Sequence, residues 1–310
     1  MKHRFNIIIL LVLIFFLAQL LGLGIVGEYV NYKASSTAGD VIIEQAAYDL
    51  TGIEPPPIEN KDYSFVYIIV ALLLGTILVL LIIKFKQVKL WKFWFFLSVV
   101  LTLLMAFSPF IFKFLKLFSL HQYSFLFTII IVLLLGYFKI YKPNIYVHNF
   151  TELFIYGGLA TILIPILNLF SIVVLLLLIS VYDMYAVWKS KHMITMATFQ
   201  SENMLFAGLL IPYKGNEAYF KGLKPKGQSN GKLKTAVLGG GDIAFPLLFT
   251  ATVLAATNNF LAAFIIAITT TLSLFCIYLI AEKNKFYPAM PFLTIGCFLG
   301  YAIVWLLGMV

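Results

Sequence analysis

Charged side chains are scarce in this chain. Of its 310 residues, 11% are charged and 62% are hydrophobic. Soluble domains are about 25% charged, so this composition excludes a soluble protein and indicates an integral membrane protein. Cysteine is also scarce. Cys276 and Cys297 both lie in apolar stretches, so we expect no disulfide framework and two buried, inert thiols.

Two further observations exclude other classes of function. The four histidines are scattered without ligand spacing, so we expect no metal site, and the sequence indicates no cofactor. The net charge is +9, but the lysines lie in the short segments between apolar runs, where the positive-inside rule places them. We therefore expect this charge to face the lipid bilayer and not nucleic acid.

Nine apolar stretches are present, each long enough to cross a bilayer as a helix of about 20 residues. They are residues 5–27, 64–83, 93–112, 123–141, 150–169, 170–188, 236–257, 260–281 and 288–308. The sequence therefore predicts an all-α bundle of nine transmembrane helices. The weakest boundary separates the fifth stretch from the sixth, where Pro165, Asn168 and Ser171 supply the turn signals. One long kinked helix is the alternative at that point.

The distribution of basic residues predicts the orientation. With the N-terminus inside, all but four of the 22 basic residues fall on the inner side. The four exceptions are Lys33, Lys61, Lys113 and Lys116. This bias predicts a multi-pass protein of the cell membrane with a cytoplasmic N-terminus and an external C-terminus.

The chain divides into three parts on this basis. Residues 1–188 hold six helices and an acidic external loop at 28–63, residues 189–235 form a basic cytoplasmic loop, and residues 236–310 hold three helices. Within the basic loop, residues 193–212 are moderately apolar, and we expect a helix lying against the membrane there.

Against this background two aspartates are isolated in apolar surroundings. Asp183 lies near the end of the sixth stretch and Asp242 just inside the seventh. A carboxylate costs several kcal/mol, roughly, in hydrocarbon, so each is a functional-site hypothesis. Asp183 precedes Lys189 by about 9 Å of helix, and Asp242 follows Lys234 by about 12 Å. We therefore expect both carboxylates near the inner side, able to face each other.

Two facing carboxyl groups allow different kinds of chemistry. One can hold a proton while the other is ionised, and water between them can attack a peptide carbonyl. The pair could also relay protons in a carrier, or each Asp could pair separately and only hold helices together. Gly239, Gly240 and Gly241 remove side chains before Asp242, so a peptide backbone could approach closely. Pro246 frees the carbonyl of Asp242 from its helical partner.

Three short motifs give the chain a resemblance to a known family. Tyr182-Asp183 lies in the sixth stretch, Gly239-Gly240-Gly241-Asp242 in the seventh, and Pro288-Ala289-Met290 at the start of the ninth. In this order they resemble the Tyr-Asp, Gly-x-Gly-Asp and Pro-Ala-Leu motifs of intramembrane aspartyl proteases, the family of presenilins and signal peptide peptidases. Residues 182–187 look like the archaeal presenilin homologues, whereas residues 242–246 are closer to signal peptide peptidases.

The resemblance implies a presenilin-like bundle that hydrolyses peptide bonds inside transmembrane helices. It implies that Asp183 and Asp242 are the catalytic pair. It also implies that Pro288, Ala289 and Met290 seat an unwound substrate beside Asp242. Tyr182, Gly239, Gly240 and Gly241 are the further candidate substrate-binding residues. Met290 stands where the family usually has Leu, and the Gly240 position is often Leu, so the substrate preference stays open.

Two alternatives to this function remain. A prepilin-peptidase-like membrane protease also uses a Gly-x-Gly-Asp aspartate, but it is not expected to carry the Pro-Ala-Leu-like motif. A proton-coupled transporter more often shows repeat symmetry, and no internal repeat is visible here. We expect single-span transmembrane proteins or peptides with external N-termini as substrates, cut near the cytoplasmic face. No obligatory protein subunit is inferred, and an oligomer is possible.

Overall fold

The computed structural model of the protein describes residues 5–30, 48–52, 60–189, 206–214, 234–280 and 287–309. Within these ranges the chain forms nine α-helices, three short 3-10 helices and one β-hairpin. The helices are α1 (Phe5–Val26), α4 (Ser64–Lys84), α5 (Val88–Lys116), α6 (Ser124–Ile140), α7 (Ile145–Leu163), α8 (Leu169–Trp188), α10 (Gly240–Thr257), α11 (Phe260–Ile280) and α12 (Met290–Leu306), with η1 (Lys61–Tyr63), η2 (His121–Tyr123) and η3 (Ile164–Ile166).

The all-α membrane fold expected from the sequence is confirmed. Each of the nine apolar stretches overlaps one of the described helices, although α5 begins at Val88 and α7 at Ile145, earlier than their stretches predict. Eight helical segments are long and apolar enough to cross a membrane, and α12 is an apolar helix of 17 residues. Large apolar side chains on the outside of the bundle, such as Leu74 and Ile77 of α4, are exposed because lipid and not water surrounds them.

The boundary between the fifth and sixth stretches is a true helix break. Pro165 lies in η3, and the chain is extended at Leu167 and Asn168 before α8 begins. The side chain of Asn168 accepts a hydrogen bond from the Ser171 N–H at 2.8 Å, and the Ser171 hydroxyl accepts from the Asn168 N–H at 3.0 Å. This reciprocal capping box starts a new helix, so the alternative of one long kinked helix is wrong.

The seventh stretch begins as a strand and not as a helix. Strand β2 (Lys234–Gly239) runs directly into α10, and it pairs antiparallel with β1 (Gly208–Lys214). The helix expected from residue 236 is therefore wrong over its first residues. The surface helix expected at 193–212 is wrong where residues 208–212 are described, because these belong to β1; residues 193–205 lie outside the described part.

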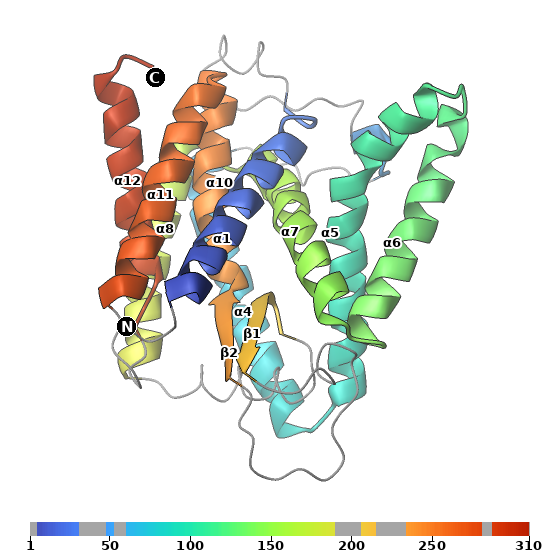
Figure 1. Cartoon of the computed structure of the whole chain (residues 1–310), viewed down its shortest axis with the longest axis horizontal. Coiled ribbons are helices and arrows are strands. Elements are labelled where there is room, and N and C mark those ends of the chain that lie inside the picture. Colours follow the sequence, from blue (N-terminus) through green and yellow to red (C-terminus); the bar gives the residue numbers. More distant parts are fainter. Residues whose placement is uncertain are drawn as a thin grey trace.

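Helix α10 is the central element of the bundle (Figure 1). It contacts α1, α7, α8, α11 and α12, and 67% of its apolar stretch is buried, against 11% for α4. Helices α5 and α6 form the outer layer beyond α7 in the same view. The hairpin lies at the end of the bundle where α1 begins, and α12 ends at the opposite end. The backbone that carries Asp242 thus starts at one membrane face and enters the middle of the bundle.

Small residues allow the helices to approach closely. A Cβ on Gly296 of α12 would lie 2.9 Å from the Thr270 Cα of α11. A Cβ on Gly158 of α7 would overlap the Thr102 carbonyl oxygen of α5. Such contacts are a main source of helix association in membranes, where lipid tails are as apolar as the side chains.

The two cysteines have different surroundings. Both are free, with Cys297 buried in α12 and Cys276 exposed in α11. The expectation of two buried thiols is therefore wrong for Cys276, because a uniformly apolar stretch does not indicate which of its faces meets lipid.

The outer edge of β1 is covered by a side chain of α7. Asn149 Nδ2 donates to the Leu210 carbonyl at 2.8 Å, and the Leu210 N–H donates to Asn149 Oδ1 at 3.0 Å. Leu210 stands opposite Val237, and the pairing becomes irregular beyond Pro212, which has no N–H. Asn149 therefore takes the place that a third strand would have, and it fixes β1 against α7.

Gly158→Ala is expected to lower the unfolding temperature of the purified protein in detergent. The added methyl group would force α5 and α7 apart, and such overpacking costs about 1–3 kcal/mol. Gly75→Ala in α4 is the matched control, because nothing lies within 4 Å of its Cβ position. Equal unfolding temperatures for the two variants would contradict the close contact at Gly158.

Asn149→Ala is expected to speed amide hydrogen exchange in β1, most of all at Leu210, because both backbone groups of that residue lose their partner. Asn144→Ala is the comparison, since Asn144 caps the start of α7 by accepting from the Tyr146 N–H at 2.9 Å. That variant should speed exchange in the first turn of α7 and leave β1 protected. Unchanged exchange at Leu210 in Asn149→Ala would contradict the proposed role of Asn149 in fixing β1.

Candidate active site

The structure brings together the two aspartates that the sequence singles out. Asp183 lies near the end of α8 and Asp242 in the first turn of α10, and both side chains are half-buried. Helices α8 and α10 contact each other, and the two carboxyl groups interact electrostatically. The helical spacing expected between Lys234 and Asp242 is wrong, because Lys234–Gly239 is extended.

Asp242 is held by the start of its own helix. Gly239 is the N-cap residue of α10, with extended backbone, and Asp242 is the third residue of the helix. The Asp242 carboxylate is hydrogen-bonded to the backbone of Gly239, as in the second half of a capping box. A Cβ on Gly239 would lie 3.1 Å from Asp242 Oδ2, so glycine leaves room for the carboxylate to fold back.

Asp183 is held by the start of a different helix. The Met290 N–H, in the first turn of α12, donates to Asp183 Oδ2 at 3.1 Å, and the Ala289 backbone also hydrogen-bonds this carboxylate. The first N–H groups of a helix have no partner within it and suit an anion. One turn earlier along α8, the Ser180 and Thr294 hydroxyls lie 2.8 Å apart and also connect α8 to α12.

The other residues of the three motifs lie around this pair. Pro288 and Met290 are buried and Ala289 is half-buried, so the Pro-Ala-Leu-like motif is fixed in place beside Asp183. Gly241 is exposed, which leaves the backbone before Asp242 accessible. The Tyr182 side chain is 41% exposed, so the structure does not bury it in the site.

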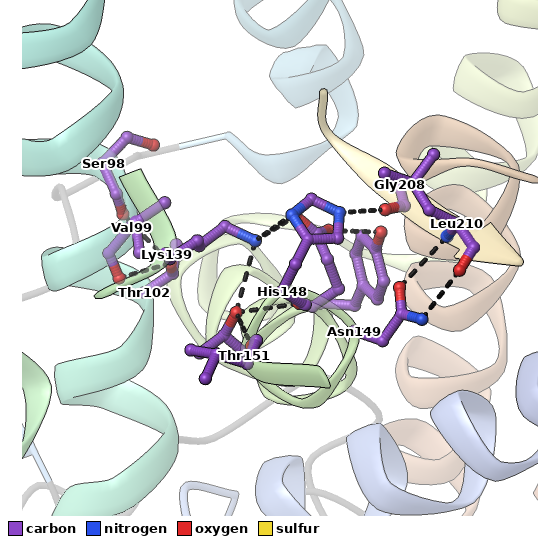
Figure 2. A network of polar contacts seen from close by, with 12 residues as sticks. Ser98, Val99, Thr102, Lys139, His148, Asn149, Thr151, Gly208 and Leu210 are labelled. Carbon is purple, nitrogen blue, oxygen red and sulfur yellow. Dashed lines mark hydrogen bonds and ion pairs between the residues drawn. The ribbon is translucent and has the colours of Figure 1, made fainter. Parts of the chain in front are cut away.

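A buried polar cluster connects α6 and α7 to the start of β1 (Figure 2). Lys139 Nζ of α6 is 2.6 Å from Glu152 Oε1 of α7, and both side chains are at most 2% exposed. The same ammonium group lies 3.4 Å from His148 Nδ1, and His148 Nε2 lies 2.8 Å from the Gly208 carbonyl oxygen of β1. A carbonyl can only accept, so this contact places the imidazole proton on Nε2 and leaves Nδ1 to accept from Lys139.

Tyr156 connects this cluster to the start of α10. Its hydroxyl donates to Glu152 Oε2 at 2.5 Å, so both oxygens of Glu152 have partners. A Cβ on Gly240 would lie 3.3 Å from Tyr156 Cε1, which places the ring against the backbone of Gly240. Tyr156 also interacts electrostatically with Asp242.

Sequence reasoning misses this cluster although a signal is present. Glu152 is a third carboxylate within an apolar stretch, and His148, Glu152 and Tyr156 recur every four residues, on one face of a helix. Lys139 looks like one more inner-side lysine at the end of a span, whereas the structure buries it. Asn149 next to this face gives no signal by itself, because its partner is the backbone of a distant strand.

Gln19 is another buried polar residue next to the site. Its Nε2 donates to the Ile243 carbonyl oxygen at 3.0 Å, and the side chain is fully buried. The contact joins α1 to α10 at the residue after Asp242. Among the described residues, no group of three or more His, Cys, Asp or Glu side chains is arranged to hold a metal ion.

Comparisons with known proteins bear on the family and on the fold. The sequence model of a family described as signal-peptide peptidase, presenilin aspartyl protease matches residues 43–310. A solved structure of a presenilin family intramembrane aspartate protease in a P2 space group is 17% identical, with a TM-score of 0.59, and the match covers 96% of each chain. A second, in a C222 space group, is 18% identical with the same TM-score and covers 97% of this chain and 99% of that one.

At these identities the two solved structures establish the fold, whereas the family match concerns the sequence itself. No curated protein sequence matches the chain. The family match extends over most of the chain and includes both aspartates and all three motifs. The chain therefore belongs to the signal-peptide peptidase and presenilin family, and it is an intramembrane aspartyl protease.

Proposed function

We propose that Asp183 and Asp242 are the catalytic dyad of this protease. The observation that carries the proposal is that the two carboxyl groups interact electrostatically and that each is supported by backbone groups at the start of a helix. Among the described residues, no ion pair joins a cation to Asp183 or Asp242. Two carboxyl groups at membrane depth without such a partner are suited to share a proton. Acid and base roles then belong to the pair as a unit.

The reaction is hydrolysis of a peptide bond. The ionised carboxylate takes a proton from a water molecule while the water oxygen bonds to the peptide carbonyl carbon. The protonated carboxyl donates its proton to the carbonyl oxygen. In the second step the protonated carboxyl gives its proton to the amine nitrogen as the C–N bond breaks. One hydroxyl of the diol gives its proton to the ionised carboxylate as the C=O bond re-forms, so the dyad again holds one proton.

The substrate is proposed to lie along β2. With Asn149 on the outer edge of β1, the opposite edge of the hairpin belongs to β2, which ends at Gly239, three residues before Asp242. An extended peptide could pair with such an edge through its own backbone. The exposed Gly241 would let that backbone approach the dyad, with Tyr182, Gly240 and the Pro288-Ala289-Met290 motif as further substrate contacts.

The proposed substrates are single-span transmembrane proteins or peptides with external N-termini. The two alternatives from the sequence, a prepilin-peptidase-like protease and a proton-coupled transporter, receive no support from the family match. With a cytoplasmic N-terminus, the end of the bundle that carries the hairpin faces the cytoplasm. Cleavage near the cytoplasmic face follows from that orientation.

Asp183→Asn and Asp242→Asn are each expected to abolish cleavage of a transmembrane peptide by the purified protein in detergent. Because the two carboxyl groups act as a unit, each single variant should lower kcat by at least about 10³-fold. Asp62→Asn is the control, since Asp62 is exposed in η1 near the start of α4. Product formation at the normal rate in either dyad variant, detected by mass spectrometry, would exclude the proposed dyad.

The orientation is tested with single cysteines in a Cys276→Ser background, which removes the exposed native thiol. Phe118→Cys, in the α5–α6 connection, is expected to react with a membrane-impermeant maleimide on intact cells. Gln87→Cys, in the α4–α5 connection, is expected to react only after permeabilisation, because the two connections lie at opposite ends of α5. The reverse pattern would show that the N-terminus is external.

A further inference from the structure

The Lys139–Glu152 pair has no part in the chemistry of the dyad, yet it is almost fully buried at membrane depth. Removing two charges from water costs several kcal/mol for each ion, and an apolar pair of similar volume is often as stable or more stable. Stability alone is therefore a weak reason for such a pair. Its position between the outer helices and the backbone that carries Asp242 indicates a second role.

One connection from the pair to the dyad passes through Tyr156. Lys139 takes one oxygen of Glu152 and the Tyr156 hydroxyl takes the other, so the carboxylate orients the ring. The Tyr156 ring packs against Gly240: a Cβ added to Gly240 would lie 3.3 Å from Tyr156 Cε1. Movement of the ring toward or away from α10 therefore moves the backbone two residues before Asp242.

A second connection passes through the hairpin. His148 accepts from Lys139 and donates to the Gly208 carbonyl, which fixes the first residue of β1. Gly208 stands opposite Gly239, and the Gly240 N–H donates to the Ala207 carbonyl oxygen at 3.1 Å. The hairpin end fixed by His148 is thus the end that continues into α10.

We propose that Glu152 and Tyr156 are positioning residues of the protease, which hold the Gly239–Asp242 turn so that Asp242 faces Asp183. The proposal rests on the proposed dyad. Lys139 serves it by holding the Glu152 side chain in place through the ion pair, and His148 fixes the hairpin from the same point. Catalytic groups need placement within about 0.5 Å, and rigid neighbours supply it.

The first experiment compares Tyr156→Phe with Lys142→Met in the full-length protein in detergent. Phenylalanine keeps the ring against Gly240 but leaves one oxygen of Glu152 without its donor. We expect kcat to fall about 10- to 100-fold, with KM nearly unchanged and the protein still folded by its unfolding temperature. Lys142 is exposed on the same side of the membrane and lies outside the cluster, so its variant should keep the normal kcat.

The second experiment separates the hydrogen-bond acceptor from the charges. Lys139→Met with Glu152→Gln removes both charges but keeps an acceptor for the Tyr156 hydroxyl. Lys139→Met with Glu152→Leu removes the charges and the acceptor together. We expect the Gln double variant to retain at least about tenfold more kcat than the Leu double variant at similar unfolding temperatures.

Each outcome decides the proposal. Equal kcat in the two double variants, or a normal kcat in Tyr156→Phe, would overturn the positioning role. A parallel loss of kcat and unfolding temperature in all three variants would also overturn it, because the cluster would then only hold the fold. The dyad is judged separately: activity in Asp242→Asn would reject the dyad itself, whereas inactive Asp242→Asn with fully active Tyr156→Phe would reject the positioning role alone.

Discussion

Every buried backbone polar group must find a partner inside the protein, and the site depends on how the buried hairpin meets this constraint. Helices satisfy themselves, but β1 and β2 do not, because a two-stranded sheet has two outer edges. On the β1 side the partners are side chains of α7: Asn149 for Leu210 and His148 for Gly208. The extended backbone of the hairpin before Asp242 therefore depends on polar side chains of α7.

The same constraint explains how the two carboxylates are held. Neither Asp183 nor Asp242 forms a described ion pair with a lysine or arginine, and backbone N–H groups support them instead. A lysine paired with either aspartate would hold that carboxylate in the ionised form, and the two aspartates could no longer exchange the acid and base roles. Lys139, the one buried lysine among the described residues, is paired with Glu152. Supporting the dyad through dipoles leaves its proton free to move.

The sequence predicts the features that are local and periodic. Apolar length defines the nine helices, and Asn168 and Ser171 mark a real break because a capping box is written in adjacent residues. The pairing of β1 with β2 is not local, since it joins residues 208–214 to residues 234–239, and each segment alone resembles the flank of a helix. The sequence contains a signal for the cluster around Glu152, because a carboxylate in an apolar stretch is also the signal that marks Asp183. The sequence does not predict Lys139 as the partner of Glu152, since a lysine at the end of a span normally reaches the membrane surface.

The bond between Gln19 and Ile243 joins residues 224 positions apart, and it has a consequence for how the protein is made. Helix α1 enters the membrane first, but α10 against which it packs is among the last helices to be synthesised. At about 5–20 residues per second, roughly 10–45 s separate the two. During that time the buried amide of Gln19 has to be sheltered by lipid headgroups, by the insertion machinery or by α7, which also packs on α1. Completion of the centre of the bundle is therefore a late step in biogenesis, and until it occurs the protease has no assembled site.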